Sequence, residues 1–214
     1  MSRILPVDPD RPDPACVREA AAAIRSGKLV VLPTDTLYGL GTNALDEEAV
    51  RKVYQVKQRP LSKPLLILIG EEEALPALIE ALPPLAERLM RAFWPGPLTL
   101  VFPASSRVLP ILRGGSPGIA IRLPALPLIQ SLVREAGVPI TGTSANLSDR
   151  PTPPTAQGVL EELGAGVDLV LDGGPCTSQK GSTLIDLTQS VPRLLREGEI
   201  SREAIEEQIG PVGW

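Results

Sequence analysis

Amphipathic segments with a helical repeat alternate along the chain with short, almost purely apolar runs. The first amphipathic segment has Asp13 as its N-cap residue, Pro14 at the first helical position and Gly27 as its stop, and its apolar residues fall on one stripe. Similar start and stop signals predict further helices at about 46–58, 76–82, 84–93, 127–136, 156–163 and 202–209. The pattern therefore predicts helices spaced regularly between apolar runs.

The apolar runs themselves predict strands, at 29–33, 65–69, 98–102, 118–123, 138–143, 168–171, 183–187 and 193–196. Runs such as 29–32 and 65–69 are continuously apolar, which is typical of strands covered on both faces. Because some runs follow one another without a helix-length spacer, part of the sheet must be antiparallel. We predict an α/β fold with a mixed parallel and antiparallel, twisted, open sheet flanked by helices, in a single domain over residues 1–214.

The composition limits where the protein works. The 214 residues are 43% hydrophobic, which is enough for a core that needs no disulfides. The longest apolar runs have about five residues, far below the roughly 18 that span a membrane. Cys16 and Cys176 are far apart and form no metal or redox motif, and the N-terminus has no signal-peptide core. We expect a cytoplasmic protein without a membrane partner.

The charge and the amino-acid composition exclude several kinds of catalytic and binding site. The chain has no histidine, which excludes His-based catalytic triads and His-ligated metals. Aromatic residues make up only 3%, which leaves few rings on which nucleobases stack. The formal net charge is -4, so the molecule as a whole is not basic, yet residues 49–70 contain five cations and no acid. This distribution indicates a local positive region in an acidic protein.

The stretch 33–44, PTDTLYGLGTNA, follows the first predicted strand. Its Gly39, Gly41 and Ala44 match a dinucleotide-binding fingerprint, but the glycines come too late after the strand and the expected acid is missing. The glycines are equally well explained by a turn that needs positive φ. The polar Thr34-Asp35-Thr36 comes at the carboxyl end of a buried strand, where α/β sheets bind ligands, and predicts a polar contact to a substrate.

The stretch 57–65, KQRPLSKPL, concentrates cations at the end of a predicted helix. Pro60 ends the helix, so that Lys57 and Arg59 can turn toward one anion, with Lys63 following. A run of charge is often only a solvated face, but this run contains no acid to neutralise it. Converging arginine and lysine side chains suit a polyphosphate.

The stretch 139–152, PITGTSANLSDRPT, is dense in hydroxyls and amides. Its Ser144, Asn146 and Thr152 would contact phosphate oxygens or a nucleobase, or would make local Asx and ST turns.

The stretch 180–188, KGSTLIDLT, has the wrong residue order for a P-loop and leads into a strand instead of a helix. Ser182 and Thr183 remain candidate ligand contacts, with Arg196 further along. The residues alone therefore predict a cationic, hydroxyl-rich cleft for a phosphorylated ligand, and they specify no reaction.

Taken together and in order, six segments closely resemble the YrdC-like family: PTDTLYGLG, KQRPLSKPL, WPGPLTLVF at 94–102, GIAIRLP at 118–124, TSANLS at 143–148, and GSTLIDLT with LLREG at 194–198. The likeness extends from about residue 29 to 198, and the length resembles that of single-domain members. It implies a YrdC-like fold and the activity of an L-threonylcarbamoyladenylate synthase, a nucleotidyltransferase. Such an enzyme joins L-threonine, bicarbonate and ATP into threonylcarbamoyl-AMP and releases pyrophosphate, and a downstream transferase then passes the threonylcarbamoyl group to tRNA.

The resemblance also implies roles for matching residues. The family's active-cleft set falls on Lys57, Arg59, Ser144 and Asn146. ATP would be contacted by Arg59, Lys63, Ser144, Thr152 and Arg196, and threonine by Thr36, Arg122 and Ser182. Mg²⁺ would be held mainly by the phosphates and water, with no metal site in the protein. Two positions depart from relatives: Leu68 stands where some have histidine against threonine, and Lys63 where others have asparagine.

Two other functions stay open. An RNA-binding module would use the positive middle of the chain to follow a phosphate backbone, and its affinity would fall steeply with salt. Weak RNA or tRNA binding would also be compatible with catalysis. A paralogue of the same fold with different carbamoyl or acyl chemistry is the second alternative, against which the intact set of Lys57, Arg59, Ser144 and Asn146 counts.

Overall fold

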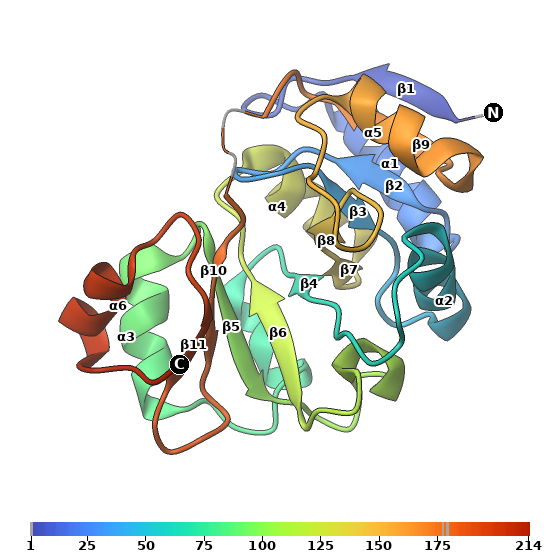
Figure 1. Cartoon of the computed structure of the whole chain (residues 1–214). Helices are drawn as coiled ribbons and strands as arrows, with labels where there is room; N and C mark the ends of the chain where they lie inside the picture. Colours follow the sequence, from blue (N-terminus) through green and yellow to red (C-terminus); the bar gives the residue numbers. More distant parts are fainter. Residues whose placement is uncertain (1, 177, 179) are drawn as a thin grey trace.

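The strands of the protein are divided between two mixed β-sheets (Figure 1). The computed structural model describes residues 2–176, 178 and 180–214. The first sheet has the strand order β1 (Arg3–Pro6), β9 (Leu169–Asp172), β2 (Val30–Leu32), β3 (Gly39–Gly41) and β8 (Thr143–Ser144). Strand β9 is parallel to both of its neighbours, whereas β3 is antiparallel to β2 and to β8.

The second sheet has the strand order β11 (Arg193–Arg196), β10 (Thr183–Asp186), β5 (Leu98–Pro103), β6 (Gly118–Arg122), β4 (Ile67–Leu68) and β7 (Ile140–Thr141). Strand β10 is parallel to β5 and β4 is parallel to β6, while the other pairs are antiparallel. The predicted α/β fold with parallel and antiparallel strands flanked by helices is confirmed. The strands nevertheless form two sheets where the sequence pattern suggested one, because the division depends on pairings between distant segments.

The helices are α1 (Pro14–Arg25), α2 (Glu47–Val56), α3 (Pro84–Phe93), α4 (Pro127–Ala136), α5 (Ala156–Leu163) and α6 (Arg202–Ile209). They confirm the predicted helices, and their caps act as expected: Asp13 accepts a hydrogen bond from the backbone N–H of Ala15 at 2.9 Å. The helix predicted at 76–82 is wrong. Residues Glu72–Ala77 form a short 3₁₀ helix instead. The chain after it bonds to the end of β5, where the Glu80 N–H donates to the Pro103 carbonyl at 2.9 Å and the Ser105 N–H donates to the Leu78 carbonyl at 3.0 Å.

Strand β3 corrects both interpretations of its glycines. Neither Gly39 nor Gly41 has a positive φ, and the segment is a buried strand between β2 and β8, so it is neither a tight turn nor a dinucleotide fingerprint. A Cβ atom on Gly41 would lie 2.7 Å from Leu32 Cδ2 and 2.8 Å from Ile140 Cγ2. Glycine is therefore required here by close packing between the strands.

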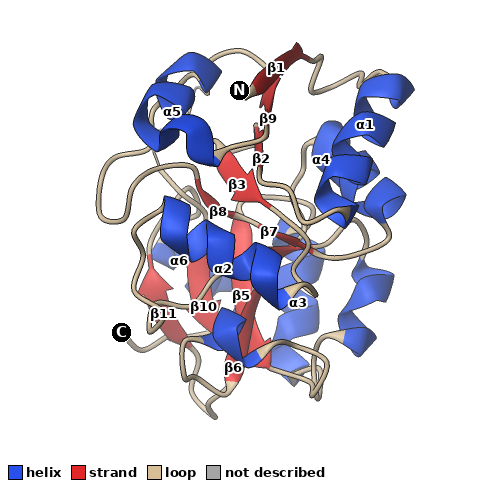
Figure 2. Cartoon of the chain, turned by 90° about the vertical axis from the view of Figure 1, so that its right-hand side faces the viewer, coloured by secondary structure: helices blue, strands red, loops and turns tan. Residues whose placement is uncertain are grey.

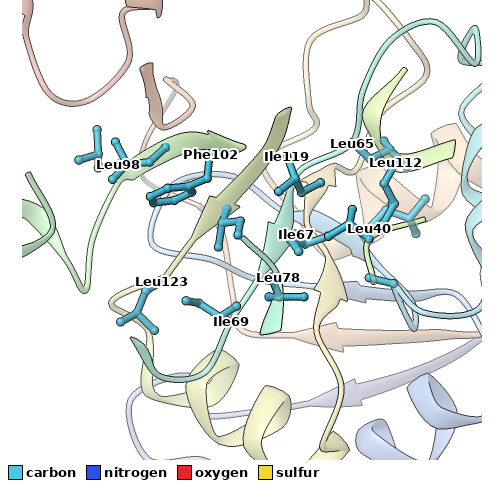
Figure 3. Close-up of a cluster of buried hydrophobic side chains, with 14 of the residues drawn as sticks. Leu40, Leu65, Ile67, Ile69, Leu78, Leu98, Phe102, Leu112, Ile119 and Leu123 are labelled. Atoms are coloured by element: carbon cyan, nitrogen blue, oxygen red, sulfur yellow. The ribbon is translucent and has the colours of Figure 1, made fainter. Parts of the chain in front are cut away.

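One large cluster of buried apolar side chains joins residues of both sheets to helices α2, α3 and α6. Figure 3 shows part of it, in which Leu98, Phe102 and Ile119 of the second sheet belong to the same cluster as Leu78 and Ile69. A second cluster lies on the other side of the first sheet, where α1 and α4 pack side by side against β2 and β9 (Figure 2). Among the described residues no helix combines the length and the apolar character needed to cross a membrane.

Candidate active site

A cavity of about 360 Å³ is lined by residues of both sheets. The first sheet contributes the loop between β2 and β3 and the chain around β8. The second sheet contributes one face, because successive side chains of a strand point to opposite sides. Thus Gly118, Ala120 and Arg122 of β6 line the cavity, while Ile119 and Ile121 pack in the core.

The cavity combines an apolar wall with a small number of charged and hydroxyl groups. Its apolar lining includes Leu66, Leu68, Val101, Ala120 and Leu184. Three arginines, Arg59, Arg122 and Arg196, line it together with the hydroxyls of Thr36, Ser144 and Ser182. The one acid among its described lining residues is Asp186, whose Oδ1 accepts hydrogen bonds from the N–H and the hydroxyl of Thr188 at 2.8 and 2.7 Å. The lining therefore suits an anionic ligand that also has an apolar part.

Arg122 is almost fully buried at the end of β6, with 4% of its surface exposed. Its Nε donates to the Gly96 carbonyl at 3.0 Å, Nη1 to the Thr36 hydroxyl at 2.9 Å, and Nη2 to Asp35 Oδ1 at 2.7 Å. Burial lowers the pKa of this guanidinium and the Asp35 carboxylate opposes that shift. Because arginine stays charged even so, Arg122 keeps a fixed, oriented positive charge at the cavity.

Arg196 is held by the backbone that precedes β10. Its Nε and Nη2 donate to the Ser182 carbonyl at 3.0 and 2.8 Å, and Nη2 also donates to the Ser182 hydroxyl at 3.2 Å. The Ser182 and Thr99 hydroxyls lie 2.7 Å apart. Burial lowers the pKa of Arg196, and the nearby charge of Arg122 lowers it further. Two guanidinium groups therefore share one region of the cavity.

Arg59 lies in the loop after α2, which ends at Val56 with Lys57 as its C-cap, ahead of Pro60. Its Nε donates to the Lys63 carbonyl at 3.3 Å and its Nη2 to the Pro64 carbonyl at 2.8 Å. Burial lowers its pKa, with Tyr54 and Asp149 acting in the opposite direction. Arg59 lines the cavity as predicted.

Lys57 is not among the described residues that line the cavity. The residue is only 1% exposed, and its Nζ donates to the carbonyls of Ser144 and Asn146 at 2.5 and 2.7 Å and to Asn146 Oδ1 at 3.3 Å. Burial and then the charge of Arg59 lower the pKa of Lys57 to about 7, while Glu162 acts in the opposite direction. Lys57 thus anchors the loop that presents Ser144.

Asn146 is the centre of that loop. Its Oδ1 accepts from the Ser144 hydroxyl at 2.5 Å and from the Thr152 hydroxyl at 3.4 Å, and its Nδ2 donates to the carbonyls of Leu147 and Arg150. Asn146 and Thr152 thus make local hydrogen bonds, while Ser144 lines the cavity and its predicted ligand contact stays a prediction.

Lys63 is half exposed and forms an ion pair with Asp149, which belongs to the Asn146 loop. Its Nζ lies 2.6 and 2.8 Å from the two carboxylate oxygens. This pairing lowers the pKa of Asp149. Of the residues predicted for the site, the structure brings together six around the cavity, namely Thr36, Arg59, Arg122, Ser144, Ser182 and Arg196. Lys57, Lys63, Asn146 and Thr152 are not among its described lining residues, and their predicted contacts stay predictions.

Two features of the site were missed by sequence reasoning. The first is the ion pair between Asp35 and Arg122, although Asp35 belongs to the Thr-Asp-Thr stretch that signalled a ligand contact. The second is the close packing of Gly142 at the cavity wall, where a Cβ atom would lie 2.5 Å from Leu68 Cγ. Nothing in a local pattern indicates either contact, because the partners come from distant parts of the chain.

No group of three or more His, Cys, Asp and Glu side chains with the spacing of a metal site occurs among the described residues. Leu68, where some relatives would have histidine, is buried and lines the cavity.

Comparison with known proteins supports the resemblance seen in the sequence. The model of the Sua5, YciO and YrdC family, described as telomere recombination, matches residues 22–198. Threonylcarbamoyl-AMP synthase of Pyrococcus abyssi is 44% identical over 196 residues, which cover 92% of this chain and 58% of that protein. Threonylcarbamoyl-AMP synthase of Bacillus subtilis is 41% identical over 197 residues, covering 92% of this chain and 57% of that protein.

The fold is equally similar. The crystal structure of Pyrococcus abyssi Sua5 complexed with L-threonine superposes with a TM-score of 0.95 at 42% sequence identity, covering 99% of this chain and 62% of that chain. The chain therefore spans about three fifths of the length of these three relatives.

Proposed function

Because the chain belongs to the Sua5, YciO and YrdC family, we propose that it is an L-threonylcarbamoyladenylate synthase, the nucleotidyltransferase that begins threonylcarbamoyladenosine modification of tRNA. Its substrates would be L-threonine, bicarbonate and ATP, and its products threonylcarbamoyl-AMP and pyrophosphate. A downstream transferase would take the threonylcarbamoyl group to tRNA. The relatives named for this activity, at 44% and 41% identity, support the proposal.

One observation carries the proposal furthest: three arginines and several hydroxyl side chains, among them Thr36, Ser144 and Ser182, line a single cavity that also has an apolar wall. An amino acid and a nucleoside triphosphate together present a carboxylate, phosphates and apolar surface, which this lining matches in kind. The threonine complex of a structure with the same fold supports the amino acid in particular.

The chemistry proposed for the cavity needs charge neutralisation and alignment. The threonine amine would attack carbon dioxide with loss of a proton, or bicarbonate with loss of water, to give a carbamate. A carbamate oxygen would then attack the α-phosphate while pyrophosphate leaves. Arg59 and Arg196 would stabilise the charge on the phosphates, and Arg122 would hold the threonine carboxylate with Thr36 and Ser182. Ser144 would contact ATP, positioned by Lys57 and Asn146 from behind.

The remaining predicted contacts fit this scheme as supporting ones. We propose that Lys63 and Thr152, which bond to Asp149 and Asn146 of the Ser144 loop, contact ATP beside that loop. Mg²⁺ would enter with the ATP substrate, held mainly by phosphate oxygens and water, because the described lining contains a single acid, Asp186, whose Oδ1 already accepts two hydrogen bonds from Thr188. The free thiols of Cys16 and Cys176 support the proposed cytoplasmic location.

The test is pyrophosphate release from ATP, Mg²⁺ and bicarbonate, compared for L-threonine, L-serine and no amino acid. Release that requires both bicarbonate and L-threonine is the expected result. Folded protein that releases no pyrophosphate in response to an amino acid would overturn the proposal. In that case RNA binding measured at low and moderate salt would distinguish the remaining alternatives, because affinity through several phosphates falls steeply with salt.

A further inference from the structure

The buried ion pair between Asp35 and Arg122 joins the two sheets at the cavity. Asp35 belongs to the loop between β2 and β3 of the first sheet, and Arg122 ends β6 of the second. The two charged atoms are 2.7 Å apart, and the side chains are only 15% and 5% exposed. Such a pair holds a guanidinium in one orientation, since charge-assisted hydrogen bonds are short and directional.

The hydrogen bonds of Arg122 divide its five N–H groups into two sets. Three of them are taken by acceptors of the protein: the Gly96 carbonyl, the Thr36 hydroxyl and Asp35 Oδ1. The other two, on Nη1 and Nη2, have no acceptor among the described residues. Arg122 lines the cavity, so these two are the groups left for a ligand. One N–H on each of the two terminal nitrogens is thus available to a carboxylate, which guanidinium groups bind through charge-assisted hydrogen bonds.

Asp35 is better explained by this function than by stability alone. Its Oδ2 is buried and has no hydrogen-bond partner among the described residues. A buried carboxylate with an unpaired oxygen is a poor way to stabilise a fold, because desolvation of the charge is only partly offset. The charge does have a local purpose. Arg122 lies close enough to Arg196 to lower the pKa of that residue, and Asp35 offsets the repulsion between the two guanidinium groups.

We propose that Asp35 is a positioning residue for the amino-acid substrate: it fixes Arg122 so that the two free N–H groups receive the substrate carboxylate. This inference rests on the proposed function. Asp35 is not among the described residues that line the cavity, so it acts through Arg122 and does not itself touch the substrate. Asp35 thereby sets the affinity for the amino acid, whereas the affinity for ATP depends on Arg59 and Arg196.

The test compares Asp35→Ala with Asp35→Asn in pyrophosphate release, varying L-threonine and ATP separately. Asp35→Ala removes the anchor and is expected to raise the KM for L-threonine about tenfold or more while the KM for ATP changes less than about twofold. Asp35→Asn keeps an oxygen for Arg122 Nη2 and is expected to restore most of the affinity. Glu19→Ala is the matched control, because it breaks an exposed ion pair with Arg3 and neither residue is among the described residues that line the cavity. It should change neither KM.

Several results would overturn the inference. Equal increases in both KM values, a loss confined to kcat, or tighter threonine binding by Asp35→Ala would each show that the carboxylate does not position Arg122 for the substrate. If Asp35→Ala fails to fold, Asp35→Glu takes its place: it keeps the buried charge but displaces it by one methylene, and the KM for L-threonine should rise alone. Wild-type protein without threonine-dependent release would overturn the proposed function, and this inference with it, whereas normal wild-type activity with unshifted variants would overturn only the inference.

Discussion

Replacing Asn146 by alanine tests whether this side chain holds together the loop that presents Ser144. Asn146 is 6% exposed, and both the oxygen and the nitrogen of its side-chain amide form hydrogen bonds within the loop. Its Oδ1 accepts from the Ser144 hydroxyl at 2.5 Å and from Lys57 Nζ at 3.3 Å. Its Nδ2 donates to the Leu147 carbonyl at 2.8 Å and to the Arg150 carbonyl at 2.5 Å. Alanine removes all of these bonds without changing the backbone.

The expected loss follows from the three short bonds. Each side-chain hydrogen bond contributes about 1 kcal/mol, so the upper value is about 3 kcal/mol. Water can reach part of this loop and replace some of the lost partners, because Arg150 is exposed and Ser144 is half-buried. We therefore expect the free energy of unfolding to fall by about 2 kcal/mol.

Urea unfolding measures this loss directly, with a lower midpoint and an unchanged m-value. Hydrogen exchange locates it: the amides of Leu147 and Ser148, bonded to Glu162 Oε1 at 2.7 Å and to the Lys57 carbonyl at 2.8 Å, should lose protection first. Asn43→Ala is the matched control, because Asn43 makes one local hydrogen bond, to the Leu45 amide at 2.9 Å. An Asn146→Ala protein no less stable than the Asn43→Ala protein, with both loop amides still protected, would refute the reasoning.

Three further variants test other parts of the site. Arg59→Ala should reduce pyrophosphate release by about 100-fold or more through loss of phosphate stabilisation, with little change in the urea midpoint; near-normal turnover would remove its assignment to the phosphates. Between about pH 7 and 10 the unfolded chain binds a proton at Lys57 that the folded chain lacks, because folding lowers the pKa of this residue to about 7. The free energy of unfolding of the wild type, measured with urea, should therefore rise relative to that of Lys57→Met by about 1.4 kcal/mol per pH unit. Parallel pH profiles of the two proteins would contradict the lowered pKa. Gly142→Ala places a Cβ atom 2.5 Å from Leu68 Cγ, so it should destabilise the fold by about 1–3 kcal/mol and raise the KM for threonine, and an unchanged urea midpoint would argue against tight packing at this wall.

Local signals were sufficient for the helices. Pro127 and Gly137 bound α4, and Ser201 and Gly210 bound α6, at the residues where the sequence predicts them. These signals work because a cap or a breaker acts on its own backbone within a few residues. The failed helix at 76–82 shows where such signals stop working, because residues 78–80 pair with the end of β5 and nothing in the local pattern indicates that pairing.

The sheets depended on information that a local pattern does not contain. Strand β3 has two glycines in three residues, a composition unfavourable to strands, yet β2 and β8 pair with it on both sides. The short strands β1 and β8 are likewise formed by partners from distant segments. The division into two sheets, and with it the cavity between them, follows from these pairings.

The cationic side chains of residues 57–63 have different partners in the structure, which shows why the sequence can locate a site and yet not predict its geometry. Lys57, Arg59 and Lys63 are close in sequence, but Lys57 bonds to carbonyls 87 and 89 residues away and Lys63 pairs with a carboxylate 86 residues away. Only Arg59 of the three lines the cavity, where it joins Arg122 and Arg196 from the second sheet. All the cations that line the cavity, within the described residues, are therefore arginines, which stay charged when buried, whereas the lysine with a pKa near 7 supports the loop behind them. It follows that charge neutralisation of the ligand does not depend on pH near neutrality, and that any pH dependence entering through Lys57 acts on the order of the Ser144 loop.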